Sequence, residues 1–189
     1  MARSYFIHTF GCQMNESDSR RMGEALARAG WEPAPVADRA DLVLLNTCSI
    51  REKAEDKLYS ALGRYRLLKT QRGTKIGVAG CVAQQEKERL LRRAPYVDFV
   101  LGPDHLDKVP ELAVTGGIET EFLDTEQYLF PQADPESSRG KATAFVTAMK
   151  GCDNVCSFCV VPYTRGREVS RPYPEIVREV AALVAVGVR

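Results

Sequence analysis

The sequence predicts an α/β protein whose first part is a parallel sheet built from βαβ units. Two observations support this fold class. Short apolar runs alternate with longer helical patterns over the first 114 residues, and such alternation indicates right-handed strand–helix–strand crossovers. The first three apolar runs also end alike, in TFGCQMNESD, LNTCSIREKA and VAGCVAQQEK. A cysteine therefore stands between each of these runs and the start of the next helix.

The elements of this first part can be placed in order. Strands are expected over Ser4–Phe10, Asp41–Thr47, Lys75–Gly80 and Val97–Gly102. Helices are expected over Glu16–Gly30, about Glu52–Gln71, about Ala83–Arg93 and about Asp104–Val114. Acidic residues at the start and a closing glycine are typical of the first of these helices. The stretch GGIETEFLDTEQYLF that follows predicts one or two strands at the edge of the sheet.

Residues 131–189 begin a different pattern. The segment Pro131–Ala142 is polar with two prolines, which is typical of a linker. A strand over Thr143–Met149 follows it, and PYPEIVREVAALVAVG predicts a helix with Pro174 near its start and Gly187 near its end. The chain then stops where a second strand is expected, and one strand–loop–helix unit cannot bury its own apolar face. We therefore expect a fragment of a longer protein, with domains 1–130 and 143–189 joined by a linker at 131–142.

Composition narrows the class of protein. The chain has 189 residues, 44% hydrophobic and 27% charged, with a net charge of +1, so no bulk field attracts nucleic acid. The start MARSYFIHTF lacks the apolar core of a secretory signal, and no apolar run approaches the ~20 residues of a membrane span. We expect a cytoplasmic protein without a membrane partner. In a reducing compartment, grouped cysteines more often indicate metal binding or catalysis than disulfides.

Three cysteines follow the first three strands. Cys12, Cys48 and Cys81 lie just beyond the carboxyl ends of predicted parallel strands, and ligands bind at that edge of open α/β sheets. Each cysteine taken alone is better interpreted as a small buried hydrophobe. Three in equivalent topological places favour a shared metal site.

The other three cysteines form one tight group. Cys152, Cys156 and Cys159 lie within eight residues, in the stretch KGCDNVCSFCVVPYTRGREVSRP. Thiolates suit zinc or iron–sulfur clusters, but structural zinc takes four ligands and no second C-x-x-C lies in this segment. His8 and His105, the only histidines, are distant in sequence. Three thiolates fit a 4Fe–4S cluster that keeps one iron open.

The C-x-x-x-C-x-x-C motif resembles the signature of radical S-adenosylmethionine enzymes. The blocks TFGCQMNESDS, NTCSIREKAEDK and CVVPYTRGREVSRP more closely resemble the methylthiotransferases, and among them the MiaB-type tRNA enzymes, over the whole chain. The resemblance implies that residues 143–189 are the first strand, cluster loop and first helix of a radical S-adenosylmethionine (β/α) barrel. The Gln13-Met14-Asn15 stretch favours the tRNA branch over the branch that modifies a ribosomal protein.

The resemblance also implies cofactors and partners. It implies a 4Fe–4S cluster on Cys12, Cys48 and Cys81, and a second on Cys152, Cys156 and Cys159 that binds S-adenosylmethionine. Phe158 would lie beside the cofactor's adenine, although an ordinary core aromatic is an equal alternative. The implied reaction is radical methylthiolation at carbon 2 of the isopentenyl-modified adenosine at tRNA position 37. A flavodoxin or ferredoxin would donate electrons to a monomeric enzyme.

Three other functions stay open: a methylthiotransferase for a ribosomal protein, one for another modified tRNA adenosine, and a non-catalytic iron–sulfur or zinc module. No catalytic side chain is expected, because the reacting C–H bond has no acidic proton.

Some charged residues invite a functional interpretation. A basic stretch could contact tRNA phosphate, but a solvated helix face is the favoured interpretation; it comprises Arg64, Arg66, Lys69, Arg72 and Lys75. The arginines after the cysteine loop could contact substrate or cofactor, or pair with nearby acids; they are Arg165, Arg167 and Arg171. Asp18 and Glu24 are expected to be helix-surface carboxylates without a catalytic part.

Overall fold

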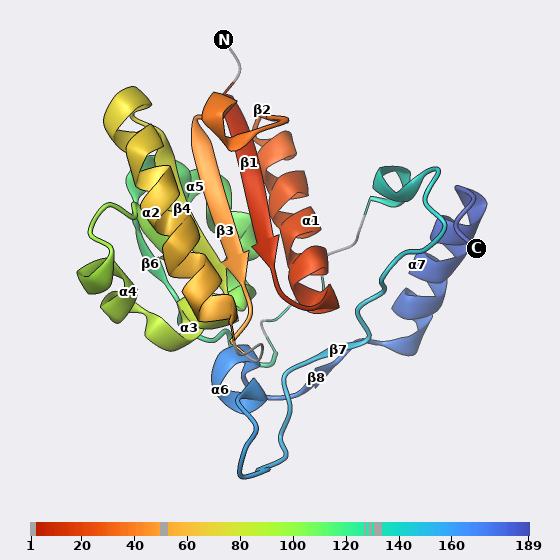
Figure 1. The fold of residues 1–189 in the computed structure, drawn as a ribbon. Coiled ribbons are helices and arrows are strands. Elements are labelled where there is room, and N and C mark those ends of the chain that lie inside the picture. Colours follow the sequence, from red (N-terminus) through yellow and green to blue (C-terminus); the bar gives the residue numbers. More distant parts are fainter. Residues whose placement is uncertain (1–2, 50–52, 127, 129, 131–133) are drawn as a thin grey trace. The chain divides into compact units, whose positions relative to one another are not determined.

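A computed structural model describes residues 3–49, 53–126, 128, 130 and 134–189 (Figure 1). The chain divides into two compact units, Met1–Phe122 and Leu123–Arg189. No helix among the described residues is long and apolar enough to cross a membrane.

The described residues of the first unit form a six-stranded parallel sheet in the order β2-β1-β3-β4-β5-β6. The strands are β1 (Arg3–Phe10), β2 (Trp31–Pro33), β3 (Leu42–Thr47), β4 (Lys75–Gly80), β5 (Phe99–Leu101) and β6 (Gly117–Glu119). From β1 the chain adds β2 on one side, and from β3 it adds β4, β5 and β6 on the other side. The direction in which strands are added therefore reverses between β1 and β3. In doubly wound sheets, this reversal marks where ligands bind, beyond the carboxyl ends of the strands.

Helices cover both faces of the sheet (Figure 1). On one face lie α1 (Gln13–Arg28), the 3₁₀ turn η2 (Pro103–Lys108) and α5 (Val109–Thr115). On the other lie α2 (Ala54–Arg72), α3 (Cys81–Glu86) and α4 (Glu88–Arg93), while a further 3₁₀ turn, η1 (Ala37–Arg39), precedes β3. Both faces are thus covered in the manner typical of parallel sheets.

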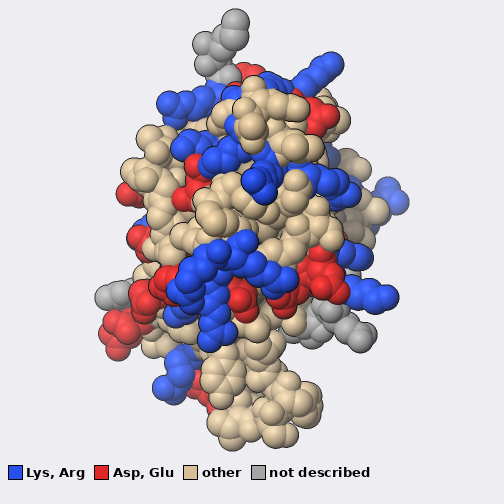
Figure 2. Space-filling model, turned by 60° about the vertical axis from the view of Figure 1, so that its left-hand side comes forward, with Lys and Arg blue, Asp and Glu red and all other residues tan. Residues whose placement is uncertain are grey.

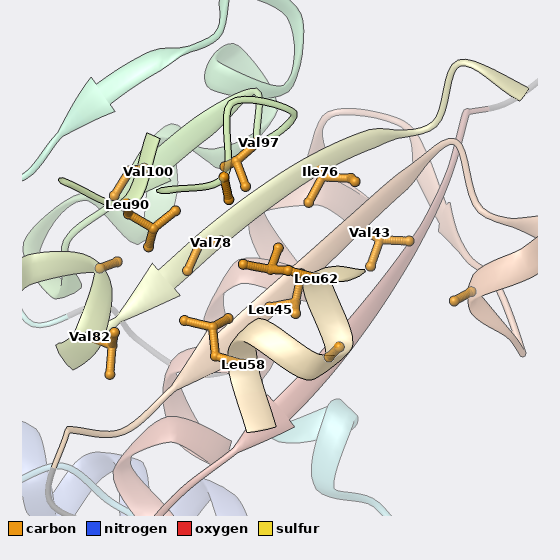
Figure 3. Close-up of a cluster of buried hydrophobic side chains, with 14 of the residues drawn as sticks. Val43, Leu45, Leu58, Leu62, Ile76, Val78, Val82, Leu90, Val97 and Val100 are labelled. Carbon is orange, nitrogen blue, oxygen red and sulfur yellow. The ribbon is translucent and has the colours of Figure 1, made fainter. Parts of the chain in front are cut away.

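Two hydrophobic clusters, one on each face, form the core. Val43 and Leu45 of β3 point into the cluster with α2, where they pack with residues such as Leu58 (Figure 3). Leu42 and Leu44 of the same strand point into the cluster with α1 and α5. Side chains of a strand alternate between its faces, so the part of β3 that packs into a hydrophobic cluster on each face is apolar at every position. This explains the continuous apolar run LVLL.

Most of the expected elements of this unit are confirmed. The fold class is α/β with a parallel sheet, β4 has its predicted bounds, and β1 and β3 differ from theirs by one residue. A strand was also expected at the edge after the last helix, and β6 fills that place. The helix expected from about Glu52 starts outside the described residues, and its described part runs over Ala54–Arg72.

Three expectations for the helices differ from the structure. The first helix begins at Gln13, three residues before Glu16, so that Cys12 is its N-cap residue. The helix expected over Ala83–Arg93 is two helices, because Lys87 between them has a φ of +47° that no α-helix allows. The helix expected over Asp104–Val114 is a 3₁₀ turn followed by a short α-helix. A continuous helix would place Pro110 in its interior, where a proline has no N–H to donate.

Strand β2 was not expected from the sequence. It has three residues, ends in Pro33 and lies at the edge of the sheet, where a proline is tolerated. Its pairing with β1 and the burial of Trp31 hold it in place. One or two strands were expected after the last helix of this unit. Among the described residues between β6 and Phe130 no second strand follows, so one edge strand is present there.

The second unit contains little sheet. Its described elements are η3 (Pro135–Ser138), β7 (Met149–Lys150), α6 (Val161–Arg165), β8 (Val169–Ser170) and α7 (Tyr173–Ala185). Helix α7 confirms the expected helix, with Pro174 in its first turn. The strand expected over Thr143–Met149 is wrong in extent, because only its last residue belongs to β7. A strand needs a neighbour to satisfy its backbone groups, and the described part of this unit offers only the two-residue antiparallel β8.

Candidate metal centres

Three cysteines stand at the carboxyl edge of the first unit's sheet. Cys12 follows β1, Cys48 follows β3 and Cys81 follows β4, and these three strands are direct neighbours. Phe10 pairs with Thr47, and Thr47 pairs with Gly80. Cys48 and Cys81 therefore lie one residue beyond the last paired positions, and Cys12 lies two beyond. The topology brings together, at one edge, positions that are 36 and 33 residues apart in the sequence.

None of these three cysteines forms a disulfide, and they differ in exposure. Cys12 is half-buried, whereas Cys48 and Cys81 are 1% and 4% exposed. The Cys48 N–H donates to the Phe10 carbonyl (3.1 Å), which fastens the turn after β3 to the end of β1. The side chain of Cys12 makes no capping hydrogen bond to α1. Backbone contacts thus fix the turns, and the thiol of Cys12 bonds to the side chain of Asn15 (3.4 Å) and not to the backbone N–H groups of the helix end.

Two glycines let the three turns approach one another. Gly11 and Gly80 have φ values of +151° and +93°, which favour glycine. A Cβ on Gly11 would lie 2.8 Å from the Cβ of Cys48, and one on Gly80 would lie 2.6 Å from the carbonyl oxygen of Thr47. The Gly-Cys dipeptides after β1 and β4 therefore reflect close packing at this edge.

A buried polar network underlies these turns. Asn15 and Asn46 are fully buried and hydrogen-bonded to each other, and Asn46 also donates to Ser19 (2.9 Å). Ser19 Oγ is 2.7 Å from Thr9 Oγ1, so the network reaches β1. In the sequence, Asn15 served only as part of the Gln13-Met14-Asn15 stretch, and Asn46 was given no role. The signal that could have found Asn46 is a polar residue inside an otherwise apolar buried strand.

The residues at this edge fit a thiolate-bound metal by their chemistry. The donors are three thiolates, which soft metals and iron–sulfur clusters prefer. Thr47 Oγ1 and Ser49 Oγ, on either side of Cys48, are buried and have no hydrogen-bond partner among the described residues, so they are available to sulfur ligands. In the part of the chain that the structure describes, no three His, Cys, Asp or Glu side chains are already arranged as a metal site. Ligation of one metal group by all three thiols would require them to turn toward a common point.

The second unit carries the other three cysteines on one irregular loop. Cys152 and Cys159 are half-buried and Cys156 is exposed. The N–H of Cys159 donates to the carbonyl of Cys156 (3.1 Å), which closes a turn between these two cysteines. The N–H of Cys152 donates to the carbonyl of Gly166 (3.2 Å), so the start of the loop is fastened to the segment that follows α6.

The tip of this loop is strongly exposed. Val155 is 96% exposed and Phe158 is 91% exposed. Phe158 is therefore not a core aromatic of this chain. Its expected place beside the adenine of a cofactor stays a proposal.

Several of the basic residues singled out in the sequence form ion pairs. Arg167 pairs with Asp153, and the buried Arg171 pairs with Glu175 and Glu179. For these two arginines the structure shows pairing with nearby acids, whereas the sequence slightly favoured the other alternative, a contact with substrate or cofactor. In the basic stretch on and after α2, Lys69 and Lys75 both pair with Asp98. Figure 2 shows Lys and Arg interspersed with Asp and Glu on the face that it displays, as the low net charge implies.

Asp18 and His8 are two further polar residues of the first unit. Asp18 is 1% exposed, so the expectation of a helix-surface carboxylate is wrong for it. It precedes Met22 by one turn, on the face of α1 that packs toward η2 and α5. His8 Nδ1 is hydrogen-bonded to the hydroxyl of Tyr65 (2.7 Å).

Fold and sites together define a class of protein: a parallel α/β unit with three thiols at its carboxyl edge, followed by a unit with a three-cysteine loop. The sequence matches the family described as "Uncharacterized protein family UPF0004" over residues 4–102. The chain belongs to this family. The matched segment contains all three cysteines of the sheet edge.

Curated relatives resemble the whole chain. It is 63% identical to the tRNA-2-methylthio-N(6)-dimethylallyladenosine synthase of Anaeromyxobacter sp. (strain K) and 64% identical to that of Anaeromyxobacter dehalogenans (strain 2CP-C), over 99% of this chain and 41% of each relative. It is 61% identical to the synthase of the same name from Myxococcus xanthus (strain DK1622), over 99% of this chain and 42% of the relative. The chain thus spans about two fifths of the length of these proteins.

Proposed function

We propose that this chain is the amino-terminal part of a tRNA methylthiotransferase. The proposed enzyme attaches a methylthio group to carbon 2 of the isopentenyl-modified adenosine at position 37, beside the anticodon. The main support is that Cys12, Cys48 and Cys81 lie at one edge of the sheet. The chain also resembles tRNA-2-methylthio-N(6)-dimethylallyladenosine synthases over nearly its whole length.

The six cysteines are the proposed metal ligands. Cys12, Cys48 and Cys81 would hold one 4Fe–4S cluster, and Cys152, Cys156 and Cys159 would hold another, each with three thiolates. When bound, the loop cluster with S-adenosylmethionine supplies radical chemistry, and the other cluster carries the sulfur that is transferred. Three protein ligands rather than four leave one iron of each cluster accessible. The exposed ring of Phe158 offers a flat apolar face for the adenine of the cofactor.

The second unit is proposed to begin a larger domain. Residues 143–189 would form the first strand, cluster loop and first helix of a radical S-adenosylmethionine (β/α) barrel, after a first domain at 1–130 and a linker at 131–142. Helix α7 carries exposed apolar side chains at Val177, Val180 and Val184, which further strands of such a barrel would cover. This explains why so apolar a helix is poorly buried in this chain.

The proposed partners follow from the reaction. The substrate is tRNA, and a flavodoxin or ferredoxin is the proposed electron donor to a monomeric, cytoplasmic enzyme. No side chain of this chain is proposed as an acid or base. The protein instead positions the cofactors and excludes water and oxygen.

Metal loading of this chain is the first test. Anaerobic reconstitution with iron and sulfide should load about eight irons per chain, as two cubic clusters require. Replacing Cys12, Cys48 and Cys81 with Ala should remove about half of the iron and leave the spectrum of the other cluster. Zinc at full occupancy with no uptake of iron would contradict the proposal. Equal loss of both clusters in the triple variant would contradict two separate sites.

The substrate is tested with the longer protein. Given S-adenosylmethionine, a reductant and tRNA with isopentenyladenosine at position 37, it should add a methylthio group that mass spectrometry detects in digested nucleosides. Unmodified tRNA should react poorly, because the isopentenyl group contributes binding and orientation. Modification of a ribosomal protein, with tRNA inert, would assign the enzyme to the other branch.

A further inference from the structure

We propose that the buried pair of Asn15 and Asn46 positions the three cysteine-bearing turns of the first unit. This inference rests on the metal site proposed above and adds to it two residues that ligate nothing. They are positioning residues, because they act on the thiols through the backbone of the turns.

The two side chains join the first turn of α1 to the end of β3. Asn15 lies three residues after Cys12, and Asn46 lies two residues before Cys48. Asn15 Nδ2 donates to Asn46 Oδ1 (2.9 Å), and Asn46 Nδ2 donates to the backbone carbonyl of Asn15 (2.8 Å). Both residues are 0% exposed. The pair therefore links the turns that bear Cys12 and Cys48 by two reciprocal bonds that are shielded from water.

The same pair fills the space beside the third turn. A Cβ on Gly80, the residue before Cys81, would collide with Asn46 Oδ1 and lie 3.0 Å from Asn15 Nδ2. A Cβ on Gly11, the residue before Cys12, would lie 2.6 Å from Asn15 Oδ1. The amide pair thus packs against the glycines that precede Cys12 and Cys81. Asn46 is also only two residues from Cys48 in the sequence.

The hydrogen bonds allow one orientation of each amide. A backbone carbonyl can only accept, so the Asn46 nitrogen must face the carbonyl of Asn15, and its oxygen must accept from Asn15 Nδ2. The oxygen of Asn15 then faces Cys12, whose Sγ lies 3.4 Å away as a donor. Because an incompletely bonded buried network is costly, the three turns resist displacement relative to one another.

Strand register alone does not achieve this. Register fixes positions up to Phe10, Thr47 and Gly80, but the thiols lie beyond the last paired residues. Their separation depends on the turns, and these turns meet at the amide pair. Groups that orient metal ligands without binding the metal typically contribute about 10–100-fold to metal affinity.

The experiment uses the full 189-residue chain with Cys152, Cys156 and Cys159 replaced by Ala, so that only the sheet-edge thiols bind metal. Two probes are used: reconstituted iron challenged with a chelator, and Cd²⁺ alone, whose thiolate complexes absorb in the ultraviolet. Asn46→Ala should speed iron loss and weaken Cd²⁺ binding by about tenfold or more. It should also change the iron cluster's Mössbauer spectrum while unfolding stays cooperative.

A matched control separates positioning from stability. Thr74 is also buried and donates to the Ala40 carbonyl (3.2 Å). However, it precedes β4 and so lies at the amino ends of the strands, whereas the cysteines lie at their carboxyl ends. Thr74→Val should lower the unfolding temperature and leave both metal readouts unchanged. Equal metal retention and spectra in the parent, Asn46→Ala and Thr74→Val variants would overturn the proposal.

A milder variant covers the case in which Asn46→Ala does not fold. Ser19→Ala leaves both bonds of the asparagine pair in place and removes the bonds of Ser19 Oγ to Asn46 Nδ2 (2.9 Å) and to Thr9 Oγ1 (2.7 Å). It should weaken Cd²⁺ binding more than Thr74→Val does; an equal effect would overturn the proposal. The Cd²⁺ probe also separates two failures. A parent that takes up no iron but binds Cd²⁺ in an asparagine-dependent way contradicts the iron–sulfur function and supports the positioning role.

Discussion

Asp153 and Arg167 form a two-point ion pair across the base of the cysteine loop. Arg167 donates from Nε to Asp153 Oδ1 (2.8 Å) and from Nη2 to Oδ2 (3.2 Å), and the N–H of Glu168 donates to Oδ1 (3.0 Å). Asp153 directly follows Cys152, whose own N–H bonds to the carbonyl of Gly166. The start of the loop is thus tied twice to the segment after α6.

The first prediction concerns this pair. Arg167→Lys keeps the charge but loses the planar two-point geometry, so we expect faster loss of loop-bound iron to a chelator. The measurement uses a chain with Cys12, Cys48 and Cys81 replaced by Ala. Arg139→Lys is the control, because Arg139 makes the same exposed two-point pair with Glu136. Identical rates of iron loss in the two variants would show that the Asp153 pair does not hold the loop.

The second prediction concerns acid stability. Burial by itself would raise the pKa of Asp98, but hydrogen bonds from Lys69, the Ile76 N–H and Lys75 outweigh it and lower the pKa below 3.8. A carboxyl group whose pKa is lower in the folded than in the unfolded state stabilises the folded protein at pH values above its unfolded-state pKa. This stabilisation is lost as the pH falls through the folded-state pKa.

Asp98→Asn should therefore lower the free energy of unfolding at neutral pH, and its difference from the parent should shrink below about pH 4. Urea unfolding across that range measures this. Glu55→Gln, at an exposed ion pair with Arg93, is the control and should change little at any pH. A constant difference between parent and Asp98→Asn down to low pH would contradict the assignment.

The third prediction concerns the break between α3 and α4. Lys87 has φ +47° and ψ −124°, a conformation that favours glycine and costs other residues about 1–3 kcal/mol. Lys87→Gly should stabilise the chain by about 1 kcal/mol in urea unfolding. Lys57→Gly, at an exposed position inside α2, should do the opposite by a similar amount. Destabilisation by both would mean that the Lys87 conformation is not strained.

The fourth prediction concerns Gly77 of β4 and Phe99 of β5, which are paired across the sheet. A Cβ on Gly77 would lie 2.7 Å from Cε1 of the fully buried Phe99 ring. Gly77→Ala should therefore destabilise the first unit by about 1–3 kcal/mol through overpacking. Combining it with Phe99→Leu should cost less than the sum of the single changes. Additive effects in urea unfolding would contradict direct contact as the cause.

The sequence predicted the elements with strong local patterns. Strands β1, β3 and β4 have six to eight residues and contain apolar stretches. Helices α1 and α7 each have an apolar face. The spacing of apolar residues and the glycines and prolines at the ends therefore identify these elements. Strand β2 was not predicted, because three residues that end in a proline are too few to show an alternating pattern. The break at Lys87 was not predicted, because a positive φ at a lysine has no signature in the sequence.

The candidate site divides in the same way. That three cysteines follow neighbouring strands could be inferred from repeated strand–cysteine–helix boundaries, because the topology alone brings such ends together. The burial of Asp18 and the amide pair of Asn15 and Asn46 could not be inferred, because they depend on which helix face packs inward. Side-chain partners from distant segments become visible only when the packing is known.

The two groups of cysteines differ in how far apart their members lie along the chain, and this has a consequence for assembly. Cys12, Cys48 and Cys81 come together only after three strands have paired, so a ribosome must deliver more than 80 residues before that site exists. Cys152, Cys156 and Cys159 can meet around a metal within one short loop, before any sheet has formed. At the proposed cluster sites, insertion would therefore follow folding in the first unit, whereas in the second unit it could precede folding and nucleate it.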